Sequence, residues 1–281
     1  MLSGTPLVEV EDLRIRFPSR SGTTEALRGV SFSMGREKLG IVGESGSGKS
    51  LTGRALLGLV PQPGIVSATA LRFDGADLLR ASTRALRQLR GRRIGLIMQD
   101  PKYSLNPVKT VGNQIAEAAR LHGGADRAAA RRQTLEMLAA VQIRDPERVW
   151  GAYPHEMSGG MAQRAMIAMM LVAGPDLLIA DEPTSALDVT VQGEVLALME
   201  GLIRQRGMGL ILISHDLRLV SRFCDRIAVM YAGRVMETLD ASGLEAARHP
   251  YTQGLLACLP AIDRPPGPLP VLRRDPAWMG A

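Results

Sequence analysis

The sequence is poor in cysteine, in aromatic residues and in long apolar runs. Its 281 residues include only two cysteines, Cys224 and Cys258, which form no CxxC pair. A disulfide framework or a cysteine-based zinc site is therefore not expected, and a reducing compartment fits. Aromatic residues make up 4% of the chain, which argues against a broad base-stacking surface for single-stranded nucleic acid.

Apolar runs are short, and no targeting segment is recognisable. The longest run near the middle, Met166–Ala173, falls well short of the roughly 20 residues that a membrane-spanning helix needs. The N-terminus leads directly into Leu7–Val10 without the basic and apolar regions of a signal peptide. We therefore expect a soluble chain, for which any membrane role requires partners.

What the chain has in excess is positive charge, nearly all of it arginine. It contains 34 Lys and Arg against 28 Asp and Glu, a formal net charge of +6. Lysine occurs only at positions 38, 49, 102 and 109. This balance suits an anionic partner, whether a nucleotide, a nucleic acid or a lipid headgroup. It does not choose among them.

The apolar pattern predicts an α/β protein. Alternation over residues 7–17 and 30–34 indicates an antiparallel β ribbon. Helical periodicity is expected after residue 50, over most of residues 111–150, and at Gly160–Val172 and Val189–Arg204. Further strands are expected at Lys38–Val42, Arg93–Met98, Leu177–Ala180 and Leu210–Ile213. From Ile262 the chain is proline-rich and is expected to be extended or poorly ordered.

A glycine-rich loop follows the strand at Lys38–Val42. Residues 43–50 match G-x-x-x-x-G-K-S, a phosphate loop, and the flanking strand and helix disfavour the alternative of a flexible turn with a chance lysine. Small residues let backbone amides surround a phosphate, and the following helix N-terminus adds positive charge. Lys49 would reach the β- and γ-phosphates, and the Ser50 hydroxyl would ligate Mg²⁺. The predicted nucleotide-binding residues here are Gly43, Glu44, Ser45, Gly46, Ser47, Gly48, Lys49, Ser50 and Leu51.

Two acidic residues end the apolar strand at Leu177–Ala180. Asp181 and Glu182 thus lie at the carboxyl end of a buried strand, where α/β sheets bind ligands. We interpret Asp181 as a ligand of Mg²⁺, through water, and Glu182 as the general base that polarises the attacking water. The alternative is a pair of acids that caps the next segment. The phosphate loop upstream favours the catalytic interpretation.

The stretch Met157–Arg164, which reads Met-Ser-Gly-Gly-Met-Ala-Gln-Arg, resembles the signature motif of ATP-binding cassette (ABC) ATPases. The other motifs of that family follow in order, over roughly Leu7 to Leu259. Gln99 matches the Q-loop glutamine, residues 185–188 look like the D-loop, His215 matches the switch histidine, and Phe17 matches the adenine-stacking aromatic.

The resemblance implies roles for these residues. Ser158 and the amides of Gly159 and Gly160 would form a second anion site, which closes on the γ-phosphate bound by a partner subunit. His215 would join Lys49 and Glu182 in catalysis by contacting the γ-phosphate or orienting water. Gln99 would ligate Mg²⁺ together with Ser50 and Asp181, and would report the nucleotide state to a transmembrane partner. Asp188 would contribute to nucleotide binding from the D-loop.

The resemblance also implies a fold and a domain layout. We expect a P-loop NTPase cassette with a RecA-like core, an antiparallel β subdomain and a helical insert subdomain. The cassette would occupy residues 5–260, with the helical insert at about residues 101–172. Residues 261–281 would form a proline-rich tail without an assigned role.

Other stretches resemble one branch of the family, the importers of oligopeptides, dipeptides and nickel. Met161 stands where glutamine is most common in the signature, as in that branch, and any nucleotide contact of that glutamine is lost. The stretches Asp100–Pro107, Tyr153–Glu156 and His249–Leu256 also look like this branch. Many members carry a cysteine-rich stretch beyond the last of these. This chain has only Cys258 there, so we expect no iron–sulfur cluster.

The sequence therefore predicts an ATP-hydrolysing subunit of a membrane importer for di- or oligopeptides, or for a related small solute such as nickel or a metal chelate. It would use ATP and Mg²⁺ at the cytoplasmic face of the inner membrane. Expected partners are a second cassette, homologous or identical, two transmembrane permeases and, indirectly, an extracytoplasmic solute-binding protein. The alternative is a soluble ABC-type ATPase acting on DNA or ribosomes. The spacing of the motifs disfavours it, and no nucleic acid is expected.

Overall fold

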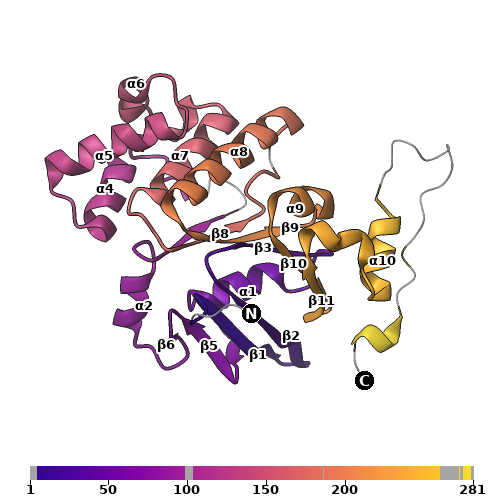
Figure 1. The fold of residues 1–281 in the computed structure, drawn as a ribbon. Helices are drawn as coiled ribbons and strands as arrows, with labels where there is room; N and C mark the ends of the chain where they lie inside the picture. The colour runs from indigo at the N-terminus through magenta and orange to yellow at the C-terminus, as the bar shows by residue number, and fades with distance from the viewer. Residues whose placement is uncertain (1–4, 99–103, 186, 260–271, 273–274, 280–281) are drawn as a thin grey trace, which may run out of the picture. The chain divides into compact units, whose positions relative to one another are not determined.

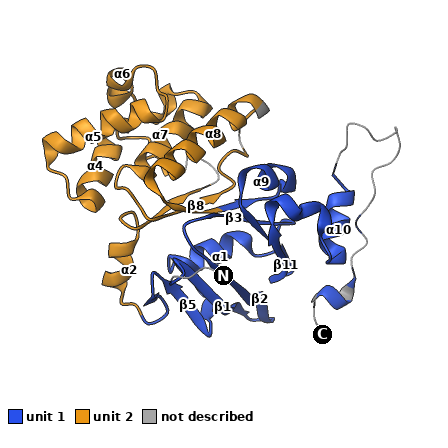
Figure 2. Cartoon of the chain, viewed as in Figure 1, with its two compact units in different colours: residues 1–80, 212–281 blue, residues 81–211 orange. Residues whose placement is uncertain are grey.

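The computed structural model describes residues 5–98, 104–185, 187–259, 272 and 275–279 (Figure 1). Its contacts divide the chain into two compact units (Figure 2). Unit 1 comprises residues 1–80 and 212–281, and unit 2 comprises residues 81–211. The phosphate loop belongs to unit 1, whereas the signature stretch and the acidic strand end belong to unit 2.

Unit 1 contains an antiparallel sheet with the strand order β2-β1-β5-β6 and with β4 also paired to β1. The register pairs Val8 with Met34 and Phe17 with Thr24, which confirms the predicted ribbon. Val8 and Val10 are buried, as are Leu13 and Ile15, because alternate residues of a strand face the same side. The register shift between Val10 and Leu13, where Asp12 has φ 49°, brings both pairs to the same buried face. The strands are β1 (Val8–Ser19), β2 (Gly22–Met34), β4 (Ile65–Ser67), β5 (Ala70–Phe73) and β6 (Ala76–Asp77).

A second group of strands in unit 1 carries the phosphate loop. The strand β10 pairs in parallel with β3 and antiparallel with β11. The side chain of Val220 in α9 packs directly on Gly40 of β3, and this close approach requires a residue without Cβ. The elements are β3 (Lys38–Gly43), α1 (Lys49–Leu56), α9 (Leu217–Phe223), β10 (Arg226–Tyr231), β11 (Arg234–Asp240), η2 (Ala241–Ala246), α10 (Pro250–Ala257) and η3 (Pro276–Met279).

Unit 2 combines a group of helices with two parallel strands, β7 and β8. Side-chain caps start several helices. Asp126 accepts a hydrogen bond from the amide of Ala129, and Asp145 accepts one from the amide of Arg148. The elements are α2 (Thr83–Leu89), β7 (Ile94–Ile97), α4 (Val111–Gly123), α5 (Arg127–Ala140), α6 (Pro146–Gly151), η1 (Pro154–Glu156), α7 (Gly159–Leu171), β8 (Leu177–Asp181) and α8 (Val189–Arg206). One boundary between the units follows Arg80, and the other falls within β9 (Gly209–Ser214).

Candidate functional site

The phosphate loop connects β3 to α1, as the sequence predicted. Gly48 is the N-cap of α1 at φ 100°, and Gly46 has φ 81°, so both use backbone conformations that L side chains rarely adopt. A Cβ on Gly43 would lie 2.1 Å from the carbonyl oxygen of Met230, so the loop starts in direct backbone contact with β10. Glycine is therefore required for the shape of this loop.

Lys49 is held inside the loop. Only 6% of its surface is exposed. Its Nζ donates hydrogen bonds to the carbonyl oxygens of Gly43, at 2.8 Å, and of Glu44, at 2.9 Å. A buried ammonium needs such partners, and these are neutral oxygens. The charge of Lys49 is thus fixed within the loop and is not neutralised by either carbonyl.

The loop fits a bound phosphate chain. The position of a Cβ on Gly46 has no heavy atom within 4 Å, so the surface above that residue is open. The buried hydroxyl of Ser47 makes no hydrogen bond to any described residue. Open glycine backbone, a free hydroxyl, a helix N-terminus and an ammonium are the groups that bind phosphate oxygens.

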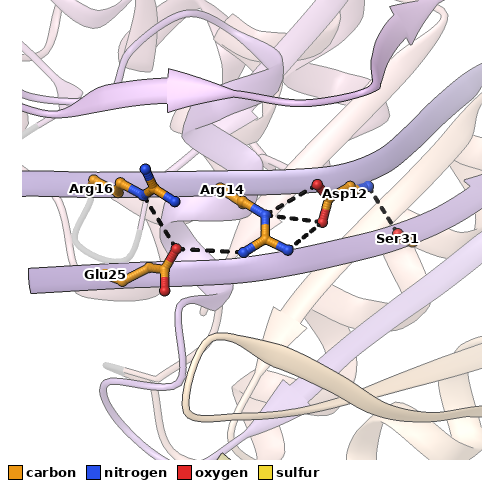
Figure 3. Close-up of polar contacts among 5 residues, drawn as sticks. All are labelled: Asp12, Arg14, Arg16, Glu25 and Ser31. Carbon is orange, nitrogen blue, oxygen red and sulfur yellow. Dashed lines mark hydrogen bonds and ion pairs between the residues drawn. The ribbon is translucent and has the colours of Figure 1, made fainter. Parts of the chain in front are cut away.

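Phe17 lies on β1. Ion pairs surround Arg14 and Arg16 on the same strand (Figure 3). The guanidinium of Arg14 donates to Asp12 at 2.8 Å and lies 3.6 Å from Glu25 on β2, and Arg16 also contacts Glu25, at 3.3 Å. The two contacts to Glu25 join β1 to β2, in a ribbon whose register is interrupted by irregularities on either side of Arg14. The Phe17 ring is half-buried and covers Gly64, where a Cβ would lie 2.9 Å from the ring atom Cε1.

The acidic strand end lies in unit 2. The strand β8 is fully buried from Leu177 to Ala180, and Asp181 and Glu182 are half-buried at its carboxyl end. Glu182 has φ 48°, a conformation that is uncommon for a residue with a side chain. Its carbonyl accepts hydrogen bonds from the amide and the hydroxyl of Ser185. Such strained positions persist only where the surrounding structure holds them.

Two glutamines hold the segment after Glu182 in place. The buried Nε2 of Gln163, on α7, donates to the carbonyl of Pro183. The Nε2 of Gln192, on α8, donates to Thr184 at 3.0 Å. The signature helix is thus joined to the acidic strand end within unit 2. The sequence predicts no role for Gln163, because a contact across 20 residues has no local signal.

The signature stretch begins α7. Ser158 is the N-cap, and its Oγ accepts a hydrogen bond from the amide of Met161 at 3.3 Å. Because the oxygen is the acceptor, the hydroxyl hydrogen can be donated to an anion. Ser158 and Gly159 are exposed, and a Cβ on Gly159 would have no heavy atom within 4 Å, whereas a Cβ on Gly160 would lie 3.1 Å from Val191 Cγ1. The predicted anion site is therefore sterically accessible.

Asp188 and His215 stand next to helix starts. Asp188 caps α8, and its carboxylate accepts from the amides of Thr190, at 3.1 Å, and Val191, at 3.0 Å. His215 is exposed at the end of β9, immediately before Asp216, which caps α9. Asp188 thus has a structural role that the resemblance did not suggest. The predicted Gln99 and Ala186 of the D-loop lie outside the described residues.

A pocket of about 900 Å³ opens beside the signature stretch, within unit 2. Its lining includes Ser158, Gly160, Met161, Arg148, Arg164 and Glu194. The guanidinium of Arg164 is held by Glu194 at 2.7 Å and by Gln142 at 3.0 Å. Met161 therefore lies on the wall of a pocket that is also lined by arginine side chains.

Two further observations concern metals and membranes. In the part of the chain that the structure describes, no three His, Cys, Asp or Glu side chains converge as a metal cluster. None of the described helices has the length and apolar character that a membrane span demands.

Comparison with known proteins agrees with this geometry. Residues 27–185 match the family model described as "ABC transporter". A probable peptide ABC transporter ATP-binding protein of Sinorhizobium fredii is 48% identical, over 95% of this chain and 83% of its own length. The oligopeptide transport ATP-binding protein OppD of Bacillus subtilis is 46% identical, over 94% of this chain and 74% of its own. The dipeptide transport ATP-binding protein DppD of Escherichia coli is 47% identical, over 90% and 78%.

Solved structures show the same fold. The dimeric ATP-binding cassette MJ0796 in a post-hydrolysis state, bound to ADP and Pi, has a TM-score of 0.73 and 25% identity, over 83% of this chain and 98% of its own. The cassette cbiO1 of Clostridium perfringens, part of the ABC transporter complex cbiONQ, has a TM-score of 0.74 and 26% identity, over 90% and 96%. The predicted fold class and family resemblance are confirmed. The chain belongs to the ABC transporter family, and it is an ATP-binding, ATP-hydrolysing cassette of that family.

Proposed function

We propose that this cassette powers a membrane importer of di- or oligopeptides. The observation that supports this most strongly is an identity of 46–48% to ATP-binding proteins of peptide, oligopeptide and dipeptide transport, over 90–95% of the chain. These relatives favour the importer over the alternative of a DNA- or ribosome-directed ATPase. Uptake of labelled di- and oligopeptides by vesicles containing the assembled transporter tests the substrate, and uptake of nickel alone would overturn it.

In the proposed nucleotide site, residues 43–51 bind the phosphates. Lys49 Nζ gives up or shares its hydrogen bonds to the loop carbonyl oxygens in order to contact the β- and γ-phosphates. The ring of Phe17 stacks on adenine. The donors that would hold Mg²⁺ are the Ser50 hydroxyl, Gln99 and, through water, Asp181. One or two such oxygen ligands, together with substrate phosphates, are a usual Mg²⁺ set. When bound, the ion neutralises charge that develops on the transferred phosphoryl group.

Hydrolysis requires a base and a second half-site. We propose that the Glu182 carboxylate accepts a hydrogen bond from the attacking water, and that His215 contacts the γ-phosphate. The Ser158 hydroxyl and the amides of Gly159 and Gly160 would bind the γ-phosphate held by a partner cassette. Asp188, which caps α8, would lie near this phosphate. The exposed Ser158 and Gly159 at the start of α7 and the dimeric structures of related cassettes support this arrangement.

Two substitutions test this chemistry in the assembled transporter, with the partner site inactivated. Glu182→Gln keeps the size of the side chain and removes the basic oxygen, so we expect ATP binding to persist and turnover to fall at least about 100-fold. Turnover near wild type would remove Glu182 as the base. Lys49→Ala should abolish nucleotide binding at this loop, and an unchanged affinity would refute the assignment of the loop.

We also propose that a permease docks on a groove in unit 2 and places the cassette at the cytoplasmic face of the membrane. A pocket of about 830 Å³ is lined by Val108, Lys109, Arg120, Arg131, Trp150 and Tyr153. It combines cations with apolar surface, and Val108 is 79% exposed. Large exposed apolar side chains in a hollow are typical of protein-binding surfaces.

Val108→Asp should release the cassette from its permeases and leave ATP affinity unchanged. Leu121→Asp is the matched control, because Leu121 is 71% exposed on α4 but does not line this pocket. Co-purification with the permeases measures the difference. Equal loss of binding in both variants, or no loss in either, would argue against docking in this groove.

A further inference from the structure

An aromatic cluster in unit 1 brings the end of the chain to the phosphate loop. The ring of Tyr251, in α10, lies 4.6 Å from Tyr231 at the end of β10 and 5.8 Å from Trp278 in η3, centroid to centroid. Trp278 also lies 6.0 Å from His249. Tyr251 is 0% exposed and is among the largest fully buried side chains of the described residues. Its hydroxyl therefore has a fixed position.

That hydroxyl contacts the phosphate loop. The amide of Glu44 donates a hydrogen bond to the Tyr251 hydroxyl oxygen at 3.4 Å, between residues 207 positions apart in the sequence. The same peptide unit carries the carbonyl of Gly43, which accepts a hydrogen bond from Lys49 Nζ at 2.8 Å. The N–H and C=O of one peptide point in opposite directions. Tyr251 and Lys49 thus hold the Gly43–Glu44 peptide from opposite sides.

We propose that Tyr251 is a positioning residue for the phosphate loop and that Trp278, from the C-terminal tail, holds Tyr251 in place. The orientation of the Gly43–Glu44 peptide decides where the loop carbonyl meets Lys49 and how the following amides face a phosphate. If this peptide is held in its binding orientation before the nucleotide arrives, binding loses less conformational entropy. The tail, for which the sequence suggested no role, then contributes to ATP affinity.

The N-terminus of α10 is itself anchored, which supports a positioning role. The carboxylate of Glu237, on β11, accepts hydrogen bonds from the amides of Arg248, at 2.7 Å, and His249, at 3.1 Å. Burial by itself would raise the pKa of Glu237, but the hydrogen bonds from these backbone amides, together with the nearby His249, favour the charged form, and the pKa is lowered. A second contact of the tail lies on the same helix, where Leu272 covers Gly254.

The test is Tyr251→Phe in the full-length chain, which removes one hydroxyl and keeps the ring. We expect the Kd for Mg²⁺-ATP, measured by calorimetric titration, to rise about 2- to 5-fold, because a single long neutral hydrogen bond is lost. The melting temperature should stay close to that of the wild type. Hydrogen exchange at the Glu44 amide should accelerate. In the assembled transporter, KM for ATP should rise while kcat is kept.

Tyr231→Phe is the matched control, because it removes a hydroxyl from the same cluster but not from the contact with Glu44. It should leave the Kd unchanged, and a rise equal to that of Tyr251→Phe would overturn the proposal. Wild-type affinity in Tyr251→Phe would also overturn it. Trp278→Ala should weaken Mg²⁺-ATP binding in the same direction, and an unchanged Kd would remove the role of the tail.

This inference rests on the proposed role of residues 43–51, and Lys49→Ala separates the two. If Lys49→Ala binds Mg²⁺-ATP normally, the proposed nucleotide site fails. If Lys49→Ala abolishes binding while Tyr251→Phe has no effect, the site stands and only the role of Tyr251 fails.

Discussion

Gly40 of β3 lies where α9 packs on the strand that leads into the phosphate loop, and Gly40→Ala should destabilise unit 1. A Cβ at this position would lie 2.0 Å from Val220 Cγ1 and 3.2 Å from Cys224 Sγ. Carbon atoms pack best at about 3.5–4.0 Å, so the added methyl group overlaps Val220 severely. A valine in a helix has one strongly preferred rotamer, so Val220 cannot easily rotate away.

The helix must then shift, and overpacking of this kind costs about 1–3 kcal/mol. Urea unfolding followed by circular dichroism measures the loss as a lower midpoint at an unchanged m-value. The structure also predicts a rescue. Val220→Ala removes the overlapping Cγ1, so the double variant should be more stable than the sum of the two single losses predicts, by at least about 1 kcal/mol.

Gly193→Ala is the matched control. Gly193 lies within α8, and a Cβ there would have no heavy atom within 4 Å. Alanine at such a position should stabilise the chain by about 0.5–1 kcal/mol. The reasoning about Gly40 is refuted if Gly40→Ala costs less than about 0.5 kcal/mol, or if the losses of Gly40→Ala and Val220→Ala are simply additive within about 0.5 kcal/mol.

Three further predictions concern single groups. Burial raises the pKa of Cys224 to about 12, so iodoacetamide at pH 8 should leave this thiol unmodified in the native chain and modify it after unfolding. Mass spectrometry detects the adduct, and an adduct on Cys224 in the native chain would contradict the burial. The hydrogen bonds from Arg14 hold the pKa of Asp12 below its ordinary value, so the stabilising effect of the Asp12 carboxylate should be present at neutral pH and be lost as the pH falls through the lowered pKa. Asp12→Asn should thus lower the melting temperature at pH 7 but no longer in strong acid. An equal loss at the two pH values would exclude the ion pair. Gly48→Ala should lower the free energy of unfolding by about 1–2 kcal/mol, because alanine is strained in the left-handed backbone conformation. It should also weaken ATP binding, because the added Cβ would lie 2.3 Å from Leu27 Cδ2. Wild-type ATP affinity in a titration would show that the loop tolerates the side chain.

Much of the fold was predictable where the signal is local. The strand at Lys38–Val42, the glycine loop and the helix after it are adjacent in the sequence, and the structure has β3, the loop and α1 in that order. The strand β8 was predicted because a continuous apolar run is typical of a buried parallel strand. The hairpin of β10 and β11 was missed because its tight turn, Ala232 at φ 46° and Gly233 at φ 82°, lacks the Asn-Gly or Asp-Gly pair that usually marks such a turn.

The candidate site divides in the same way. Residue types and spacing alone indicated the phosphate loop and the acidic pair Asp181 and Glu182, because each chemistry needs those groups within a few consecutive residues. The signature was identified by its resemblance to the family motif. The resemblance gave Ser158 and Asp188 nucleotide contacts. Only the structure showed that both also cap helices.

The sequence by itself thus determined the family, the fold class and the chemistry expected at the loop and strand end. It did so because turn geometry, helix starts and apolar periods are encoded within short segments. The tertiary structure decided which distant residues support those segments. The contacts of Gln163 with Pro183 and of Tyr251 with Glu44 join residues 20 and 207 positions apart. Such pairs form only when the whole chain has folded, and no local pattern specifies them.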